Sequence, residues 1–122
     1  MILIHWLRAR AALSGALMAA GLAAASGSAF AQGNKCAEEA ASIRRAETQL
    51  PRLEVAPPDD QQIVCITLET NILFARRLAA HVASCPRSPH ARNAGTWQRT
   101  NSQYTDRFSE RRCKPAIRGY NG

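Results

Sequence analysis

Cys65 and Cys85 stand at the two ends of one stretch, CITLETNILFARRLAAHVASC, whose apolar residues recur at helical spacing. A helix rises ~1.5 Å per residue, so the Cα atoms of these two cysteines would lie about 30 Å apart. A disulfide needs Cα atoms roughly 4.4–6.8 Å apart, and the two cysteines therefore cannot bond to each other. If they are oxidised, each is bonded to a different part of the chain.

The amino-terminal 31 residues have the three parts of a secretory signal peptide. Two arginines precede an apolar run over residues 11–25, and the small residues Ala29 and Ala31 come before a cleavage site that we expect between Ala31 and Gln32. The alternative is an uncleaved anchor, but a run of 15 apolar residues is shorter than the ~20 that span a bilayer. We therefore expect export.

Export defines the compartment and the domain. We expect residues 1–31 to be removed and residues 32–122 to form a single domain in the periplasm or outside the cell, with no transmembrane segment after cleavage. A domain of this size gains only a few kcal/mol from its hydrophobic core, and small exported domains often add disulfides. The four cysteines (Cys36, Cys65, Cys85 and Cys113) all lie in this part, which predicts two disulfides.

The cysteines have two alternative uses. Four free buried thiols would need the reducing cytosol, which conflicts with the signal peptide. A zinc site would need four ligands, but the chain has no C-x-x-C pair, and its one close His–Cys spacing is His81 with Cys85. We therefore expect no metal and no cofactor.

Helix geometry also predicts which cysteines pair. The Cys65–Cys85 bond is excluded by length, and Cys85–Cys113 is excluded in the same way because a third predicted helix separates them. The remaining connectivity is Cys36–Cys85 with Cys65–Cys113. It fits an all-α domain, a small three-helix up-down-up bundle in which the middle helix is fastened to one neighbour at each end.

Caps and prolines predict where the helices begin and end. We expect Asn34 to cap the first helix, Asp59 the second and Ser88 the third. No run of residues alternates apolar and polar side chains as a strand would. The expected helices run from about Asn34 to Leu50, from about Asp60 to Ser84, and from Pro89 or a few residues later to near Cys113.

One face of the third predicted helix carries its aromatic side chains. Trp97, Asn101, Tyr104 and Phe108 follow at spacings of four, three and four residues. We interpret this stripe as the core-facing side of the helix rather than as a binding platform.

Charge is distributed unevenly along the chain. Residues 32–85 carry six basic and seven acidic side chains, whereas residues 86–122 carry eight basic and two acidic ones. Such a basic surface can bind lipid headgroups, polysaccharide or an acidic protein, although a solvated face in an arginine-rich chain is the alternative. Nucleic acid is not expected, because the chain is exported and has no binding motif. The residues expected to form the outer, basic face of the third helix are Arg92, Arg99, Arg107 and Arg111.

Catalysis has little support in the sequence. Neither His81 nor His90 has a serine or carboxylate at a spacing that local helix geometry would turn into a triad or dyad. We expect His81 to be a partly buried helix residue and the Asp59-Asp60 pair to be a helix cap. No glycine-rich phosphate loop and no redox or haem motif is present. These absences predict that the protein is not an enzyme.

The function hypothesis follows from these expectations. No stretch carries a family motif, so no site residue is transferred from a known protein. We expect a non-enzymatic binding or interaction protein of the bacterial periplasm or exterior, whose partner is an unknown protein or an anionic component of the envelope. The alternative is a binder of lipid or polysaccharide that uses the basic third helix, and a small hydrolase-type enzyme is less well supported.

Overall fold

The computed structural model describes residues 21–117, and every regular element in this part of the chain is helical. Contacts divide the chain into two units, residues 1–32 and residues 33–122. The disulfides, buried residues and pockets described below belong to the second unit. None of the described helices is both long enough and apolar enough to cross a membrane. The elements are α1 (Gly21–Thr48), the 3₁₀ helix η1 (Leu53–Val55), α2 (Gln61–Ser84), the 3₁₀ helix η2 (Pro89–Asn93) and α3 (Ala94–Glu110).

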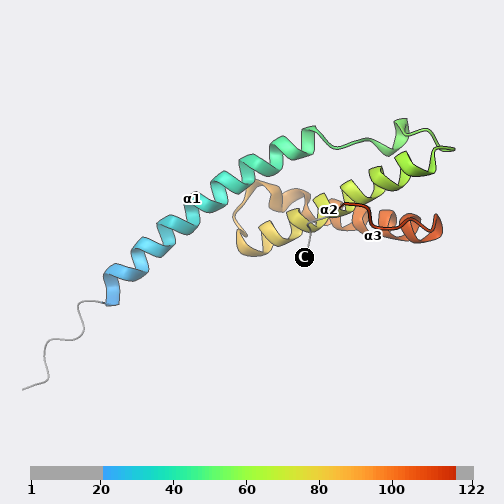
Figure 1. Ribbon diagram of the computed structural model, residues 1–122. Helices are drawn as coiled ribbons and strands as arrows, with labels where there is room; N and C mark the ends of the chain where they lie inside the picture. Colours follow the sequence, from blue (N-terminus) through green and yellow to red (C-terminus); the bar gives the residue numbers. More distant parts are fainter. Residues whose placement is uncertain (1–20, 118–122) are drawn as a thin grey trace, which may run out of the picture. The chain divides into compact units, whose positions relative to one another are not determined.

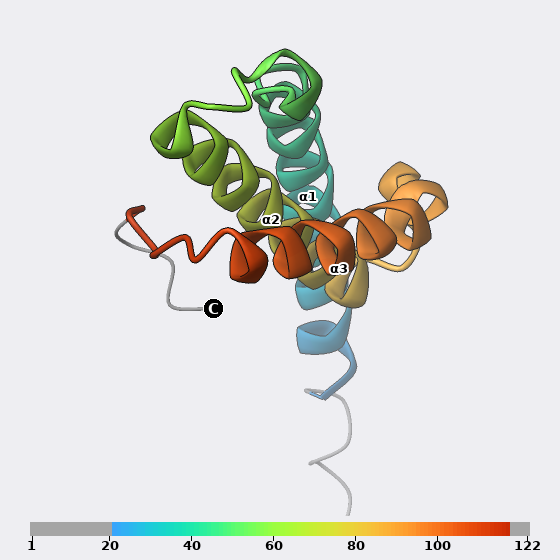
Figure 2. The same cartoon turned by 90° about the vertical axis from the view of Figure 1, so that its right-hand side faces the viewer.

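Two disulfides connect the helices, and both are the predicted ones. Cys36 and Cys85 are bonded with their Cα atoms 5.8 Å apart, and Cys65 and Cys113 with theirs 5.5 Å apart. The chain reverses at η1, so that α2 runs back beside the second-unit part of α1, and α3 then reverses again and crosses α2 (Figures 1 and 2). The predicted all-α, up-down-up bundle with two disulfides is therefore confirmed.

The beginning of the first helix was predicted wrongly. α1 begins at Gly21, so Asn34 lies within the helix and does not cap it. The residues before Asn34 are rich in alanine, the best helix former, and no proline occurs between Gly21 and Pro51 to interrupt the helix. α1 ends at Thr48, close to the predicted end, because the following proline disfavours helix at the residue before it.

The second helix begins one residue later than predicted. Asp60, rather than Asp59, is its N-cap, and its side chain accepts a hydrogen bond from the Ile63 backbone N–H at 3.1 Å. The helix ends at Ser84 as expected. Ser88 is confirmed as a cap, because its side chain accepts a hydrogen bond from the His90 backbone N–H. The turn that it caps is η2, and regular α-helix starts only at Ala94.

The end of α3 explains how Cys113 reaches α2. Arg112 has a φ of 56°, in the left-handed region that favours glycine. The backbone N–H of Arg112 donates to Ser109 and that of Cys113 donates to Phe108, which is the hydrogen-bond pattern of a Schellman motif. The motif turns the chain sharply back, so that Cys113 faces the start of α2.

The hydrophobic core joins all three helices. Ile43 of α1 packs with Phe74 and Leu78 of α2, and Trp97 of α3 packs against this cluster. The rings of Phe74 and Trp97 meet edge to face with centroids 4.7 Å apart. Trp97, Asn101, Tyr104 and Phe108 are each partly buried, whereas most of the rest of α3 is exposed. The predicted stripe is therefore the inner side of α3.

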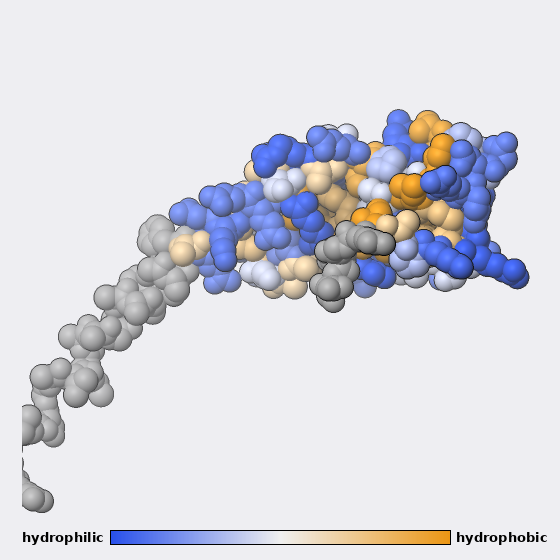
Figure 3. All heavy atoms as spheres, viewed as in Figure 1, coloured by the Kyte–Doolittle hydropathy of each residue, from blue (hydrophilic) through white to orange (hydrophobic). Residues whose placement is uncertain are grey.

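In the middle helix, several polar side chains are buried while two isoleucines are exposed. Asn71 is buried and donates to the Pro51 carbonyl oxygen at 2.9 Å, and the buried Glu69 accepts hydrogen bonds from two backbone N–H groups of the tail after α3. Ile63 and Ile66 are instead 44% and 40% exposed. The space-filling view shows hydrophobic residues reaching the surface between hydrophilic ones (Figure 3).

Candidate functional site

The four arginines predicted to face solvent do so. We call Arg92, Arg99, Arg107 and Arg111 the basic surface; all four are exposed. Within residues 21–117, the ion pairs of 4.0 Å or less join Arg52 to Glu54 and Glu39 to His81, so none of the four is paired with a described carboxylate. Their positive charge is therefore available to a partner, and the prediction that this surface binds an anion stays a prediction.

The members of the basic surface differ in how firmly they are held. Arg111 donates to the Pro58 carbonyl oxygen at 3.1 Å and to the Gln61 side chain at 3.4 Å, and it accepts from the Gln61 amide at its own carbonyl oxygen. It thus ties the end of α3 to the segment before α2. Arg99 donates only to Thr96, one turn earlier on its own helix. Arg107 has no side-chain hydrogen bond to another described residue.

A pocket of about 370 Å³ lies beside two of these arginines. Arg107, Glu110 and Arg111 of α3 and its C-cap form its charged edge. Its remaining lining comes from η1, the connection to α2 and the first half of α2. These lining residues are mainly apolar: Leu53, Ala56, Pro58, Val64 and Leu68. The pocket was not predicted, because its walls come from two separate segments of the sequence, residues 53–68 and residues 107–111.

Tyr104 stays neutral near this edge. Burial raises the pKa of its phenol above the ordinary value, the Glu54 carboxylate raises it further, and the Arg107 guanidinium acts in the opposite direction. The neighbourhood of Arg107 therefore holds a neutral hydroxyl and a carboxylate as well as its own positive charge.

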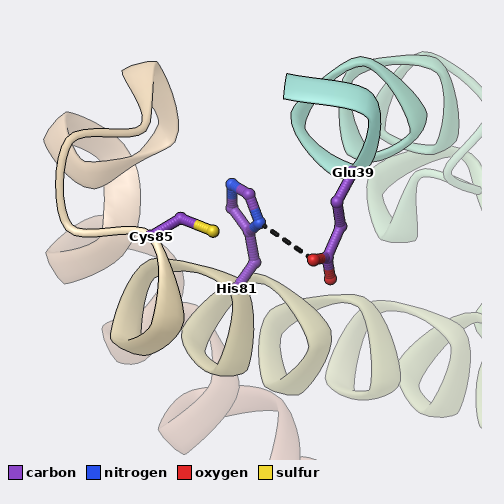
Figure 4. A group of neighbouring side chains, drawn as sticks. All are labelled: Glu39, His81 and Cys85. Carbon is purple, nitrogen blue, oxygen red and sulfur yellow. Dashed lines mark ion pairs between the residues drawn. The ribbon is translucent and has the colours of Figure 1, made fainter. Parts of the chain in front are cut away.

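A second cluster surrounds His81 at the other end of α2. The His81 side chain is fully buried, its Nε2 atom lies 2.7 Å from the Ser88 hydroxyl, and its Nδ1 atom lies 3.4 Å from a Glu39 carboxylate oxygen (Figure 4). His90 is buried as well and donates from Nε2 to the Ala40 carbonyl oxygen at 2.8 Å. His81 was predicted to be only partly buried, and none of these partners was predicted from the sequence.

One arrangement of protons that fits these contacts has the Ser88 hydroxyl as the donor to His81. Ser88 Oγ accepts from the His90 backbone N–H, so its own hydrogen is free to point at His81 Nε2. Nδ1 of the neutral ring then carries the other hydrogen and faces Glu39. The Nδ1–Glu39 distance of 3.4 Å is short enough for an ion pair, yet Nδ1 makes no hydrogen bond.

Ser88, His81 and Glu39 follow the order of a serine–histidine–acid relay, but the surroundings differ from those of a catalytic triad. The Ser88 oxygen already caps η2, the imidazole has no exposed surface, and Glu39 does not hydrogen bond to the ring. The pockets described along α2 include none of the three residues. The network joins α1, α2 and η2, and the prediction that the protein is not an enzyme stays a prediction.

One further side chain belongs to this cluster. The ligand atoms of Glu39, His81 and Cys85 all lie within 4.8 Å of one another (Figure 4). Cys85 is bonded to Cys36, however, so in the disulfide form only the His81 nitrogen and the Glu39 carboxylate are available to bind a cation.

Comparison with known proteins adds no relative: the chain matches no protein-family model, no curated protein and no solved structure. Its function must therefore be inferred from its own residues.

Proposed function

We propose that the protein is an exported, non-enzymatic binding protein of the bacterial periplasm or exterior, and that the pocket edged by Arg107 and Arg111 is its binding site. The observation that supports this proposal is the pocket's combination of an apolar lining with two guanidinium groups at one edge. Such a site suits a partner that presents an apolar group next to an anionic one, because burial of the apolar group and charge pairing act together.

The disulfide at this end of α2 supports the same proposal. The Cys65–Cys113 bond fastens the chain just after α3 to the first half of α2, and residues from the end of α3 and from α2 both line the pocket. Arg111 makes a second connection through its hydrogen bonds to Pro58 and Gln61. A site whose walls are held before the partner arrives loses less conformational entropy on binding.

A second candidate is an anion binder that uses the whole basic surface rather than the pocket. It is supported by the absence of a described carboxylate within 4.0 Å of the four arginines and by the excess of eight basic over two acidic side chains in residues 86–122. Lipid headgroups or envelope polysaccharide would then be held by long-range attraction, which weakens with salt because the Debye length falls to about 8 Å at physiological ionic strength.

Two arginine variants distinguish the candidates. Arg107→Gln removes a charge at the pocket, and Arg99→Gln removes one from the same helix but away from the pocket lining. Each variant and the wild type are used to capture partners from envelope extracts at low and moderate salt, and to co-sediment with neutral and anionic vesicles.

The pocket proposal expects a partner that Arg99→Gln retains and Arg107→Gln loses. Vesicle binding that is salt-sensitive and falls equally in both variants would favour the second candidate. If the wild type binds nothing under any of these conditions, both candidates are wrong.

A further inference from the structure

The end of α2 that carries His81 holds four potential metal ligands at helical spacing. Cys36 and Glu39 are three residues apart on α1, and His81 and Cys85 are four residues apart at the end of α2. Residues three or four apart lie on the same face of a helix. Because Cys36 and Cys85 are bonded, these two faces are turned toward each other.

The distances suit a tetrahedral ion. Two ligands that are each about 2.1 Å from zinc and separated by a tetrahedral angle lie roughly 3.4 Å apart. His81 Nδ1 and the Glu39 oxygen are 3.4 Å apart, and a ring nitrogen of His81, a Glu39 oxygen and the Cys85 sulfur all lie within 4.8 Å of one another. The Cys36 sulfur is next to that of Cys85 because the two are bonded. Four donor atoms of the types that zinc prefers are therefore gathered in one place.

His81 provides an independent sign of a ligand. Its Nδ1 atom is buried, has no hydrogen-bond partner and faces the Glu39 carboxylate, and the Cys85 side chain approaches the ring from the other side (Figure 4). The ring can present a lone pair at Nδ1 if its hydrogen moves to Nε2 and is donated to Ser88 Oγ, which lies 2.7 Å away. A histidine that binds a metal usually donates its other ring N–H in this way.

We propose that reduction of the Cys36–Cys85 disulfide creates a Zn²⁺ site made of Cys36, Glu39, His81 and Cys85. A dithiol reductant supplies two electrons and two protons, becomes a disulfide itself, and leaves two cysteine thiols. Zn²⁺ then binds as both thiols release their protons to solvent, so that the ion is held by two thiolates, one neutral imidazole and one carboxylate. Reoxidation reforms the Cys36–Cys85 bond, removes two of the four ligands and releases the ion.

This site is separate from the proposed binding pocket, since the two share no residue. Glu39 gives the ion a route of entry, because its side chain is 44% exposed whereas that of His81 is fully buried. Metal binding would replace the lost disulfide as the link between α1 and the end of α2. The reduced chain is therefore expected to regain helical structure and thermal stability when Zn²⁺ is added.

The test uses Co²⁺ as a spectroscopic substitute for Zn²⁺ in the double variant Cys65→Ser/Cys113→Ser, in which the remaining cysteines are the proposed ligands. A phosphine reductant cleaves the disulfide by taking oxygen from water, and the phosphine oxide that forms leaves two thiols. We expect thiolate-to-cobalt charge-transfer absorption at one Co²⁺ per chain, its loss when Zn²⁺ displaces Co²⁺, and a rise in far-ultraviolet helical signal on metal addition. Without reductant, we expect none of these changes.

The matched control is Cys36→Ser/Cys85→Ser, which has the same number of thiols in the other pair. We expect no charge-transfer absorption from it after reduction. Glu39→Gln, an exposed and conservative change, is expected to weaken Zn²⁺ binding by at least about tenfold, the loss seen when even an outer partner of a metal ligand is removed.

Three results would overturn the proposal. The first is equal Co²⁺ affinity of the oxidised and reduced chains, and the second is the same absorption from the control pair. The third is a reduced Cys65→Ser/Cys113→Ser chain, folded or unfolded, that shows neither absorption nor helix gain with metal.

Discussion

The two ends of α2 carry the same kind of cross-link in different surroundings. At the Cys85 end, the cysteine is 6% exposed and lies near His81 and His90, which are buried and hydrogen bonded across three helices. At the Cys65 end, both cysteines are partly exposed, isoleucines reach the surface, and three pockets of 260–370 Å³ follow the first two-thirds of the helix.

The comparison indicates a division of roles. Buried and hydrogen-bonded histidines lie beside the Cys36–Cys85 bond, so that this end of the domain is closely packed. The Cys65–Cys113 bond instead links α3 to α2 in a region where pockets remain between the elements. A disulfide beside an open pocket suits a preorganised binding site. A disulfide among potential metal ligands suits a site that depends on the redox state.

The largest expected effect is the loss of either disulfide. The two bonds close loops of similar length, with sequence separations of 49 and 48 residues, so each should contribute about 4 kcal/mol through the entropy of the unfolded chain. Any difference in the free energy of unfolding between the two double serine variants therefore comes from the residues around each disulfide. We expect Cys36→Ser/Cys85→Ser to be the less stable by urea unfolding, since a buried contact is lost as well. Equal stabilities would contradict the contrast between the two ends.

The next largest effect is expected in the core. Leu78 is 1% exposed and packs with Ile43 and Phe74, so Leu78→Ala should lower the free energy of unfolding by about 2–5 kcal/mol. Ile66 is 40% exposed near the open end, and Ile66→Ala should cost less than about 1 kcal/mol. Thermal unfolding followed by circular dichroism measures both. A cost at Ile66 that matches the one at Leu78 would mean that the exposed isoleucine is part of a closed core.

Substitution of the helix caps near the two ends of α2 is expected to have smaller effects on stability. Asp60→Ala removes a single cap hydrogen bond, at a cost of about 1 kcal/mol. Ser88→Ala removes a cap and also the partner of the buried His81 Nε2, and it should cost about 2 kcal/mol or more. Denaturant unfolding of the two variants under one set of conditions gives the difference. If Asp60→Ala proves the more costly, the His81 network contributes no stability of its own.

The smallest expected effect is stabilising. Arg112 adopts a left-handed backbone conformation, with φ of 56°, and glycine adopts it without strain. Arg112→Gly should therefore raise the free energy of unfolding by roughly 0.5–1 kcal/mol. The exposed neighbour Lys114, outside the Schellman motif, provides the control: Lys114→Gly should bring no gain. A lower melting temperature of Arg112→Gly would indicate that the Arg112 side chain makes a stabilising contact.

Much of the fold could be predicted because it depends on local rules. The rise of a helix excludes two cysteine pairs, and the prolines near Leu50 and Cys85 end helices wherever the rest of the chain lies. Errors occurred where two local signals competed. Asn34 is a good cap, but the alanine-rich residues before it favour helix more strongly. Asp59 and Asp60 are equally suitable caps by residue type, and the sequence alone does not show which of them precedes the first helical residue.

The candidate sites could be predicted only in part. The exposure of Arg99 and Arg107 follows from spacing along α3, whereas Arg92 lies in η2 and Arg111 is the C-cap of α3. The pocket edge at Arg107 could not be seen in this way, because its apolar wall belongs to η1 and α2. The His81 cluster was missed because Glu39 and Ser88 come from separate segments, and no pattern within one helix connects them.

By itself, the sequence determined the helices, the pairing of the cysteines and the direction in which each helix runs. These depend on helix rise, periodicity and bond length, which act over short stretches of chain. Only the tertiary structure decided which polar groups would be buried together around His81, and which apolar residues of α2 would remain at the surface beside a pocket. Burial depends on what lies opposite a side chain in space, and two helices of known sequence can pack with many relative rotations and shifts along their axes.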